Sequence, residues 1–308
     1  MSKTMDRTRH FLSIADWDTK DIQGLLRLGA SLKAEQKVGK HHRLLEGKSL
    51  AMIFEKASTR TRMSFEVGIF QLGGQAIFIA PQHSQMGRGE PVRDTARVMS
   101  RYVHGIMIRT FAQSMVEEFA RYSDVPVING LTDRLHPCQI MADIMTIIER
   151  KGDIQKRSVA WIGDGNNMAN SWLNASAKLG FSLRLACPQG YDPDPSILEE
   201  ADKKNPGGIT LTRDPIEAAR GADVVTTDVF ASMGQEDQAA ERLEVFRTFQ
   251  VNSDLMKHAA PDAMFLHCLP AHRGEEVSEE IFESEASAVW DEAENRLHIQ
   301  KAIMATLM

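Results

Sequence analysis

Short apolar runs alternate with amphipathic segments along most of the chain. The run from Leu50 to Phe54 has the length of a buried strand, and the next segment, 61–72, has helical spacing and stops at Gly73-Gly74. The predicted strands are 50–54, 75–80, 105–108, 125–129, 157–162, 182–186, 222–227 and 263–266. The predicted helices are one that Asp18 caps and others at 61–72, 95–103, 136–150, 169–179, 194–204, 214–220, 241–249, 254–259, 279–283 and 292–307.

The alternation of strand and helix indicates an α/β fold with parallel sheets. Lys151-Gly152-Asp153 interrupts the pattern near the middle of the chain and is typical of a hinge. We therefore expect two α/β domains, over residues 1–150 and 151–290, with a last helix in 291–308.

Composition narrows the class of protein. The 308 residues are enough for one large or two medium domains, and the content of 43% hydrophobic and 25% charged residues is that of a soluble globular protein. The formal net charge of -6 disfavours a nucleic-acid partner. Cys138, Cys187 and Cys268 are few and unclustered, which predicts neither a disulfide framework nor a metal knuckle and favours the cytoplasm. The polar N-terminus predicts no signal peptide, and no run is long enough to span a membrane.

One turn between a strand and a helix concentrates groups that bind anions. Ser58-Thr59-Arg60-Thr61-Arg62 follows the strand at 50–54 and supplies three hydroxyls and two guanidiniums at the start of a helix. Free N–H groups, the helix dipole and arginine side chains all favour a phosphate there. An ordinary N-cap with a solvated basic turn explains the same residues about equally well.

Other polar residues stand where predicted strands end, the usual place of ligands in α/β sheets. Arg109 and Asp228 directly follow strands, and His136 opens a helix that carries Gln139 one turn later. Surface or capping roles remain open for all four. Gly163-Asp164-Gly165 only partly matches a dinucleotide fingerprint, and a tight turn that presents Asn167 is the better interpretation.

Three motifs resemble the aspartate and ornithine carbamoyltransferases. They are Ser58-Thr59-Arg60-Thr61-Arg62, His136-Pro137-Cys138-Gln139, and His267-Cys268-Leu269-Pro270-Ala271-His272-Arg273-Gly274, the last in its ornithine form. The resemblance covers nearly the whole chain. It implies a last helix that crosses back onto the N-terminal domain and a homotrimer, or a multiple of one, in which the loop with Gln85 reaches a neighbouring subunit's site.

The resemblance also implies the chemistry: transfer of the carbamoyl group from carbamoyl phosphate to the δ-amine of L-ornithine, giving L-citrulline and phosphate. We expect no cofactor, and we expect no metal because no second histidine or carboxylate falls at ligand spacing on the helix face of His136. The implied catalytic residues are Arg60, Arg109, His136, Asp228 and Cys268. The implied carbamoyl-phosphate residues are Ser58, Thr59, Arg60, Thr61, Gln85, Arg109, His136, Pro137, Cys138, Gln139, Cys268, Leu269 and Arg296, the last placed at the start of the final helix. The implied ornithine residues are Asn167, Asp228, Ser232 and Met233.

Several alternatives stay open. Relatives that act on aspartate, putrescine or N-acetylated ornithine are runners-up within the family. A non-catalytic phosphate-binding module and an NAD-dependent oxidoreductase are the alternatives outside it. Arginine synthesis is the default direction, and citrulline breakdown is the other. A buried free cysteine is more often inert packing than a base, so the assignment of Cys268 as proton acceptor depends on the resemblance.

Overall fold

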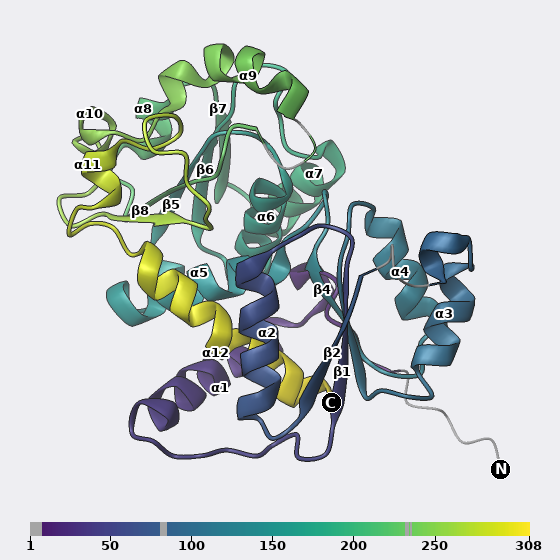
Figure 1. Cartoon of the computed structure of the whole chain (residues 1–308). Coiled ribbons are helices and arrows are strands. Elements are labelled where there is room, and N and C mark those ends of the chain that lie inside the picture. Colours follow the sequence, from purple (N-terminus) through teal and green to yellow (C-terminus); the bar gives the residue numbers. More distant parts are fainter. Residues whose placement is uncertain (1–7, 81–84, 232–233, 235) are drawn as a thin grey trace. The chain divides into compact units, whose positions relative to one another are not determined.

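A computed structural model describes residues 8–80, 85–231, 234 and 236–308 (Figure 1). Ser232 and Met233, two of the predicted ornithine residues, lie outside this set. The chain divides into two compact units. The first unit comprises the described part of Met1–Cys138 together with Arg296–Met308, and the second unit is Gln139–Asn295.

The first unit is built on a parallel sheet of four strands in the order β2-β1-β3-β4. The strands are β1 (Ser49–Phe54), β2 (Gln75–Ile79), β3 (Gly105–Arg109) and β4 (Val127–Leu131). The register pairs Phe54 with Arg109, so the residues after β1 emerge next to the end of β3. Because β1 and β3 are the point where the strand order reverses, this edge is where an α/β sheet binds ligands.

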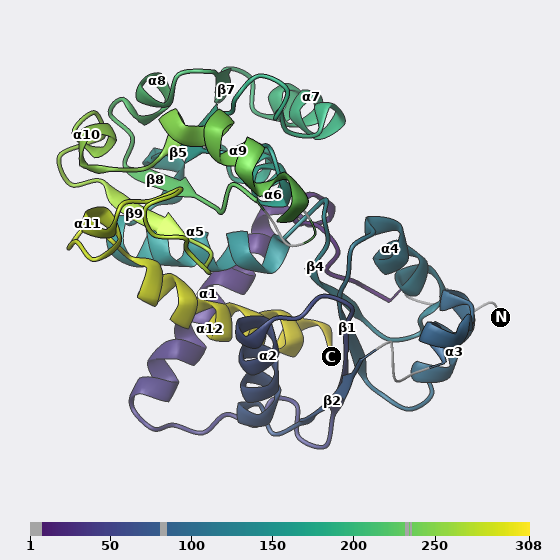
Figure 2. The same ribbon diagram turned by 45° about the horizontal axis from the view of Figure 1, so that its top comes forward.

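Helices cover the sheet of the first unit. They are α1 (Thr19–Lys37), α2 (Thr59–Gln71), α3 (Val92–Met99), α4 (Gln113–Tyr122) and the part of α12 (Val289–Leu307) from Arg296 onward, with 3-10 turns at Ile14–Asp16 and Met86–Arg88. Helices α3 and α4 lie together on one side of the sheet, and α2 and α12 lie side by side on the other (Figure 2). Ile53, Ile108 and Phe119 belong to the core between the sheet and the α3–α4 side.

Two glycines after α2 allow a close approach to the segment that precedes β1. A Cβ on Gly74 would lie 2.8 Å from the carbonyl oxygen of Lys48, and Gly73 has a φ of 88°. A side chain at either position would therefore push away the segment that leads into β1. Gly68 gives a similar close approach on α2, where a Cβ would lie 3.0 Å from Met304 of α12.

The second unit has a parallel sheet of five strands in the order β7-β6-β5-β8-β9. The strands are β5 (Ser158–Ile162), β6 (Ser182–Ala186), β7 (Ile209–Thr212), β8 (Val224–Thr227) and β9 (Met264–His267). The order reverses between β5 and β8, which again defines one ligand-binding edge. Phe230, Phe246 and Phe265 are buried in its core.

The helices of the second unit are short and mostly capped by side chains. They are α6 (Asn167–Leu179), α7 (Pro195–Lys204), α8 (Pro215–Ala219), α9 (Ala239–Phe246), α10 (Ser253–Met256), α11 (Glu279–Phe282), most of α5 (Pro137–Lys151) and the start of α12, with 3-10 turns at Ile154–Lys156, Glu236–Gln238 and Arg247–Phe249. Asn166, Asp194 and Asp214 each accept backbone N–H groups as N-caps. No described helix is both long enough and apolar enough to cross a membrane.

The predicted fold class is confirmed, with two parallel α/β sheets and a last helix that packs on α2. Several predicted boundaries were wrong. Helix α3 begins three residues before the predicted 95, directly after Pro91. Helix α12 begins at Val289 rather than 292, so Arg296 lies in its interior and not at its start. The prediction missed α4, where only Val116 and Phe119 are buried, and the partly exposed edge strand β7, because neither has a long apolar pattern.

Candidate active site

The turn after β1 caps the start of α2 and carries the exposed side chain of Arg60. Ser58 Oγ accepts from the backbone N–H of Thr61 at 3.2 Å and donates to Thr61 Oγ1 at 3.0 Å. Arg296 Nη2 also donates to Thr61 Oγ1, at 2.8 Å. Thr59 and Arg60 are exposed. The two interpretations of this turn, an ordinary N-cap and an anion site, are therefore compatible, because Ser58 caps α2 while Arg60 stays available to an anion.

The two arginines of the turn differ in their contacts. Arg62 Nε lies 3.0 Å from Glu66 Oε1, and its guanidinium lies 4.0 Å from the centre of the Phe78 ring. Among the described residues, Arg60 pairs with no carboxylate. Arg62 is therefore occupied by its own helix and by β2, and Arg60 is the guanidinium that a ligand can use.

Arg109 and His136 add two buried polar groups to the first unit. Arg109 ends β3, and His136 immediately precedes α5, which begins at Pro137. Burial lowers the pKa of His136 well below its usual value, and the charges of Arg296 and Arg109 lower it further. The imidazole is therefore neutral at pH 7, so it can donate one N–H to a polarised oxygen without adding charge.

Cys138 and Gln85 occupy contrasting places. Cys138 Sγ donates to the carbonyl of Asn129 at 3.4 Å, and burial raises the pKa of this thiol to about 12. Its side chain therefore fills the interior of the first unit, and a substrate contact at Cys138 would have to use the main chain. Gln85, by contrast, is exposed just before the turn Met86–Arg88.

Gln139 offers an acceptor within the second unit. Its Nε2 donates to Asp143 Oδ1 and to Glu292 Oε1, both at 2.8 Å. Its Oε1 is buried and accepts no hydrogen bond from the described residues. An unpaired buried acceptor is costly unless a ligand donates to it. Glu292, which the sequence analysis missed, also accepts from the backbone N–H of His267 at 2.8 Å and so fixes the start of the His267–Pro270 segment.

Asp228 is the centre of the second unit's polar cluster. It follows β8, and its Oδ1 accepts from Cys268 Sγ at 3.1 Å and from the backbone N–H of Val229 at 2.8 Å. Its Oδ2 accepts from Asn166 Nδ2 at 3.0 Å. Burial raises the pKa of Cys268 well above its usual value, and the nearby negative charge of Asp228 adds to the effect. Cys268 is therefore a thiol that donates to a carboxylate.

Asn166 is a second residue that the sequence analysis missed. Its Oδ1 caps α6 by accepting from Met168 and Ala169, while its Nδ2 holds Asp228. The preference for asparagine at N-caps was the available signal. Asn167, the predicted residue, is the first residue of α6.

The backbone of the His267–Pro270 segment, which follows β9, is strained at Leu269. Leu269 has a φ of 59°, a region that non-glycine residues rarely adopt. The N–H of Leu269 donates to His267 Nδ1 at 2.9 Å, and His267 Nε2 lies 3.0 Å from Glu276 Oε1. His267 therefore holds this turn rather than facing a ligand.

Among the residues that the structure describes, two clusters of side chains each bring three potential metal ligands within 4.8 Å of one another. The clusters are Asp228-His267-Cys268 and His272-Glu275-Glu276. Hydrogen bonds to neighbouring protein groups explain the packing in both. The Gly163–Gly165 turn also has a structural explanation, because a Cβ on Gly165 would lie 2.2 Å from the backbone of Asp192 and Pro193.

Each unit thus carries one polar cluster at the point where its strand order reverses. The first unit's cluster is suited to an anion, and the second unit's cluster is suited to a cationic amine. Each sheet therefore places polar groups at the edge where an α/β enzyme binds its ligands.

Comparisons with known proteins identify the family. The family profile for the carbamoyl-P binding domain of aspartate/ornithine carbamoyltransferase matches residues 9–149, and the profile for its Asp/Orn binding domain matches residues 155–307. The chain belongs to the aspartate/ornithine carbamoyltransferase family of enzymes, and the resemblance predicted from its motifs is confirmed.

Individual relatives match over nearly their full length. The chain is 61% identical to a protein of Geobacter metallireducens named "Ornithine carbamoyltransferase", over 98% of this chain and 99% of that protein. It is 54% identical to the "Ornithine carbamoyltransferase, anabolic" of Pseudomonas aeruginosa, over 97% of each chain. The solved ornithine carbamoyltransferase of Pyrococcus furiosus superimposes with a TM-score of 0.94 at 52% identity, over 98% of this chain and 97% of that one.

Proposed function

We propose that this enzyme transfers the carbamoyl group of carbamoyl phosphate to the δ-amine of L-ornithine, in the direction of arginine biosynthesis. The observation that carries the proposal is the 61% identity, over 98% of the chain, to a protein named for this activity. The anabolic name of the Pseudomonas aeruginosa relative supports the direction.

The charge of Asp228 in the second unit supports ornithine as the acceptor. Asp228 is largely buried, and its hydrogen-bond donors among the described residues are the neutral groups of Asn166, Val229 and Cys268. A buried carboxylate without a cationic partner attracts an ammonium and repels a second carboxylate. Ornithine brings such an ammonium, whereas the side chain of aspartate brings a negative charge.

The donors of the first unit suit carbamoyl phosphate. Ser58, Thr59, Arg60 and Thr61 would hold the phosphate at the start of α2, with Arg296 reaching the same turn through Thr61. Arg109 and the neutral His136 would stabilise the oxyanion that develops on the carbonyl oxygen. In the second unit, the unpaired Oε1 of Gln139 would accept from the carbamoyl NH2 group.

The reaction requires a neutral amine. The δ-ammonium has a pKa of about 10.4 in solution, by analogy with lysine, so it must lose a proton before it attacks the carbonyl carbon. We assign this proton to the Cys268–Asp228 pair, in which the carboxylate is the basic partner because the thiol is already protonated. Attack forms the C–N bond, the bond from carbon to the phosphate oxygen breaks, and the second proton of the amine leaves with phosphate.

The remaining predicted residues keep the roles that the resemblance implies. Pro137, Cys138 and Leu269 would contact carbamoyl phosphate through their main chain. Asn167, Ser232 and Met233 would bind the α-carboxylate end of ornithine. We also retain a boundary between the domains near residue 150, which is supported by family profiles that end at 149 and resume at 155.

We further propose a homotrimer in the cytoplasm. Large apolar side chains are exposed on α2 and on the edge strand β2, namely Met63, Val67, Phe70, Ile77 and Phe78. An apolar face of this kind is typical of an interface. Gln85 would act in the site of the neighbouring subunit. The three free cysteines suit a reducing compartment.

A citrulline assay with competing acceptors tests the function. Purified enzyme receives carbamoyl phosphate with ornithine, N-acetylornithine, putrescine or aspartate, and each carbamoylated product is quantified. We expect ornithine to give the highest kcat/KM by at least about tenfold, because only ornithine among these acceptors combines a δ-amine, a free α-amine and an α-carboxylate. Faster carbamoylation of another acceptor would overturn the assignment of ornithine.

A further inference from the structure

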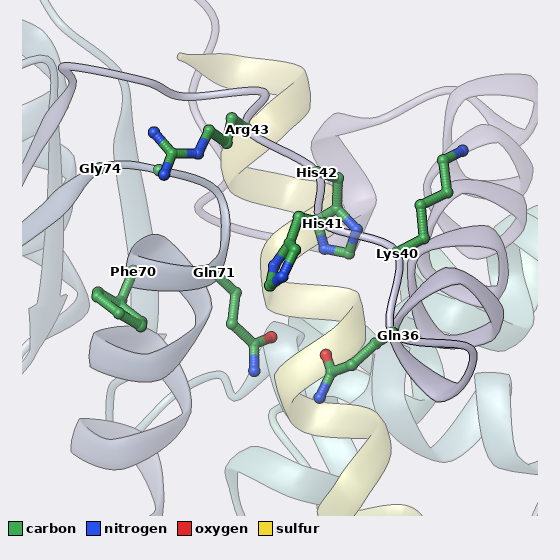
Figure 3. A pocket seen from close by; sticks show the side chains of 10 residues that line it. Gln36, Lys40, His41, His42, Arg43, Phe70, Gln71 and Gly74 are labelled. Atoms are coloured by element: carbon green, nitrogen blue, oxygen red, sulfur yellow. The ribbon is translucent and has the colours of Figure 1, made fainter.

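A second hollow lies in the first unit, at the opposite end of α2 from the anion-binding turn (Figure 3). Its volume is about 430 Å³. The lining comes from the end of α1, the following segment 39–43 and the end of α2, and consists of Gln36, Gly39, Lys40, His41, His42, Arg43, Phe70, Gln71, Gly73 and Gly74. We call this hollow the α1–α2 pocket. Thr59 and Gln71 are the two ends of α2, roughly 18 Å apart along the helix axis, so this pocket is separate from the turn at Ser58.

The lining of the α1–α2 pocket contains cations and no acidic residue. Lys40, Arg43 and the imidazoles of His41 and His42 belong to the lining, and in Figure 3 the side chain of Lys40 extends outward, away from the two glutamines. Residues 33–48 contain five Lys and Arg against two Glu, a balance of +3, in a chain whose net charge is -6. Lys40 pairs with Glu35 at 2.5 Å and Arg43 pairs with Glu46 at 2.8 Å, so both side chains already have one partner at the rim.

A buried lysine supplies a further charge behind the lining. Lys301 of α12 is 0% exposed, and its Nζ lies 2.7 Å from Gln36 Oε1, 2.9 Å from Gln71 Oε1 and 3.3 Å from His42 Nε2. All three partners are neutral groups that line the pocket. The nearest compensating carboxylate, Glu35, faces the other ring nitrogen of His42 at 3.3 Å.

This arrangement fixes the orientation of two amide side chains of the lining. Because Oε1 of Gln36 and of Gln71 accepts from Lys301, the NH2 group of each amide is left to donate elsewhere. In Figure 3 the two glutamines face each other beneath His41 and His42. The lining of the α1–α2 pocket is therefore backed by a buried cation that, among the described residues, pairs with no carboxylate.

We propose that the α1–α2 pocket binds a small organic polyanion, such as a di- or tricarboxylate or a phosphorylated metabolite. Its volume exceeds that of a single phosphate ion and falls in the range of small-molecule sites. Its donors are those that recognise carboxylate and phosphate oxygens. The site goes beyond the proposed catalytic activity and does not depend on it.

Binding at this pocket falls as the pH rises. Burial lowers the pKa of Lys301 to about 8, against the opposing effect of Glu35. The groups that face Lys301 are Gln36 and Glu35 of α1, Gln71 of α2, and His42 of the connecting segment, with Lys40 close to His42. Lys301 is charged below this pKa and neutral above it, so the affinity for an anion decreases between pH 7 and pH 9.

Calorimetry with two probe anions tests the proposal. Citrate represents the carboxylates and pyrophosphate the phosphates, and each is titrated at constant ionic strength into the wild-type enzyme and into Arg60→Ala, which disables the anion-binding turn. We expect at least one probe to bind Arg60→Ala with one site per chain and a Kd below about 1 mM. The probe that binds more tightly identifies the ligand chemistry.

Two pocket variants and one matched control locate the binding. Lys301→Met keeps the length of the side chain, and Lys40→Ala changes an exposed ion pair. Lys203→Ala is the control, since Lys203 is 69% exposed and pairs with Glu199 at 2.6 Å, much as Lys40 is 63% exposed and pairs with Glu35. In the Arg60→Ala background, we expect Lys301→Met and Lys40→Ala each to weaken binding about tenfold and Lys203→Ala to leave it unchanged.

The proposal is overturned if neither probe binds below millimolar concentration, if either pocket variant binds as tightly as its parent, or if Lys203→Ala weakens binding equally. Melting temperatures report whether each variant is folded. Should Lys301→Met fail to fold, Lys40→Ala and the decline of affinity from pH 7 to 9 decide the question.

Discussion

Replacing Asp228 by asparagine keeps the shape of the side chain and removes its charge. In the wild-type protein, Oδ1 accepts from Cys268 and Val229, and Oδ2 accepts from Asn166. An asparagine places an NH2 group at one of these two positions, and every facing group is a donor. Asn166 cannot turn its amide without losing the cap on α6, because its Oδ1 already accepts from Met168 and Ala169.

Two magnitudes follow from this geometry. One opposed pair of donors costs about 1–3 kcal/mol of stability. Loss of the charge opposite a desolvated ammonium costs about 2–5 kcal/mol of binding, or about 30-fold to several thousand-fold in Kd. We therefore expect a moderately lower melting temperature and a much larger loss of affinity for ornithine.

Calorimetry with two amino acids separates these effects. The enzyme is first saturated with an unreactive methylene analogue of carbamoyl phosphate and then titrated with ornithine or with norvaline, which lacks the δ-amine. If Asp228 meets the δ-ammonium, Asp228→Asn weakens ornithine and leaves norvaline nearly unchanged. Equal weakening of both ligands, or of the carbamoyl-phosphate analogue, would refute this reasoning.

A double variant provides the matched control. Asn166→Asp with Asp228→Asn exchanges the two side chains, so that an NH2 group at 228 can donate to a carboxylate at 166 that still caps α6. We expect the melting temperature to recover while ornithine binding recovers only in part, because the negative charge now lies one side chain away. Full recovery of ornithine affinity would show that the position of the charge is unimportant.

Four further predictions concern other residues. Arg60→Ala should lower turnover by about 2.7–4 kcal/mol, or 10²–10³-fold, while Arg62→Ala, whose arginine is paired with Glu66, should retain most activity in the same assay. An inactive Arg60 variant mixed with an inactive Gln85 variant should regain activity after subunit exchange, and no recovery despite demonstrated exchange would contradict a shared site. Arg242→Met should raise the KM for ornithine more than that for carbamoyl phosphate, because Arg242 Nη1 binds Asp164 Oδ2 at 2.8 Å and the carbonyl of Phe230 at 2.9 Å and so holds the segment after β8. The pKa of His136 is lowered in the folded chain, so below about pH 6.5 the unfolded chain takes up a proton that the folded chain does not, and stability falls with the pH. Melting temperatures from pH 5 to 7.5 should therefore depend less on pH in His136→Gln than in the wild-type protein.

The sequence by itself determined the fold class, the family and the principal anion-binding turn. Buried parallel strands are continuous apolar runs, so β1, β3 and β5 could be recognised locally. Residues that follow such strands lie at the ligand-binding edge of the sheet, which is why Arg109 and Asp228 could be selected. Local signals were weakest for the half-exposed strand β7 and the short helix α4, and both were missed.

Only the tertiary structure decided which side chains are free to act. Arg60 and Arg62 look alike in the sequence, but Glu66 and Phe78 occupy Arg62. Arg296 and Thr61 are 235 positions apart, and Gln139 and Glu292 are 153 apart. The contacts of Asn166 with Asp228, and of Lys301 with three neutral groups, likewise join residues distant in sequence. A sequence pattern records local propensity and burial, whereas a hydrogen-bond partner or a desolvated charge depends on which segments the fold brings together.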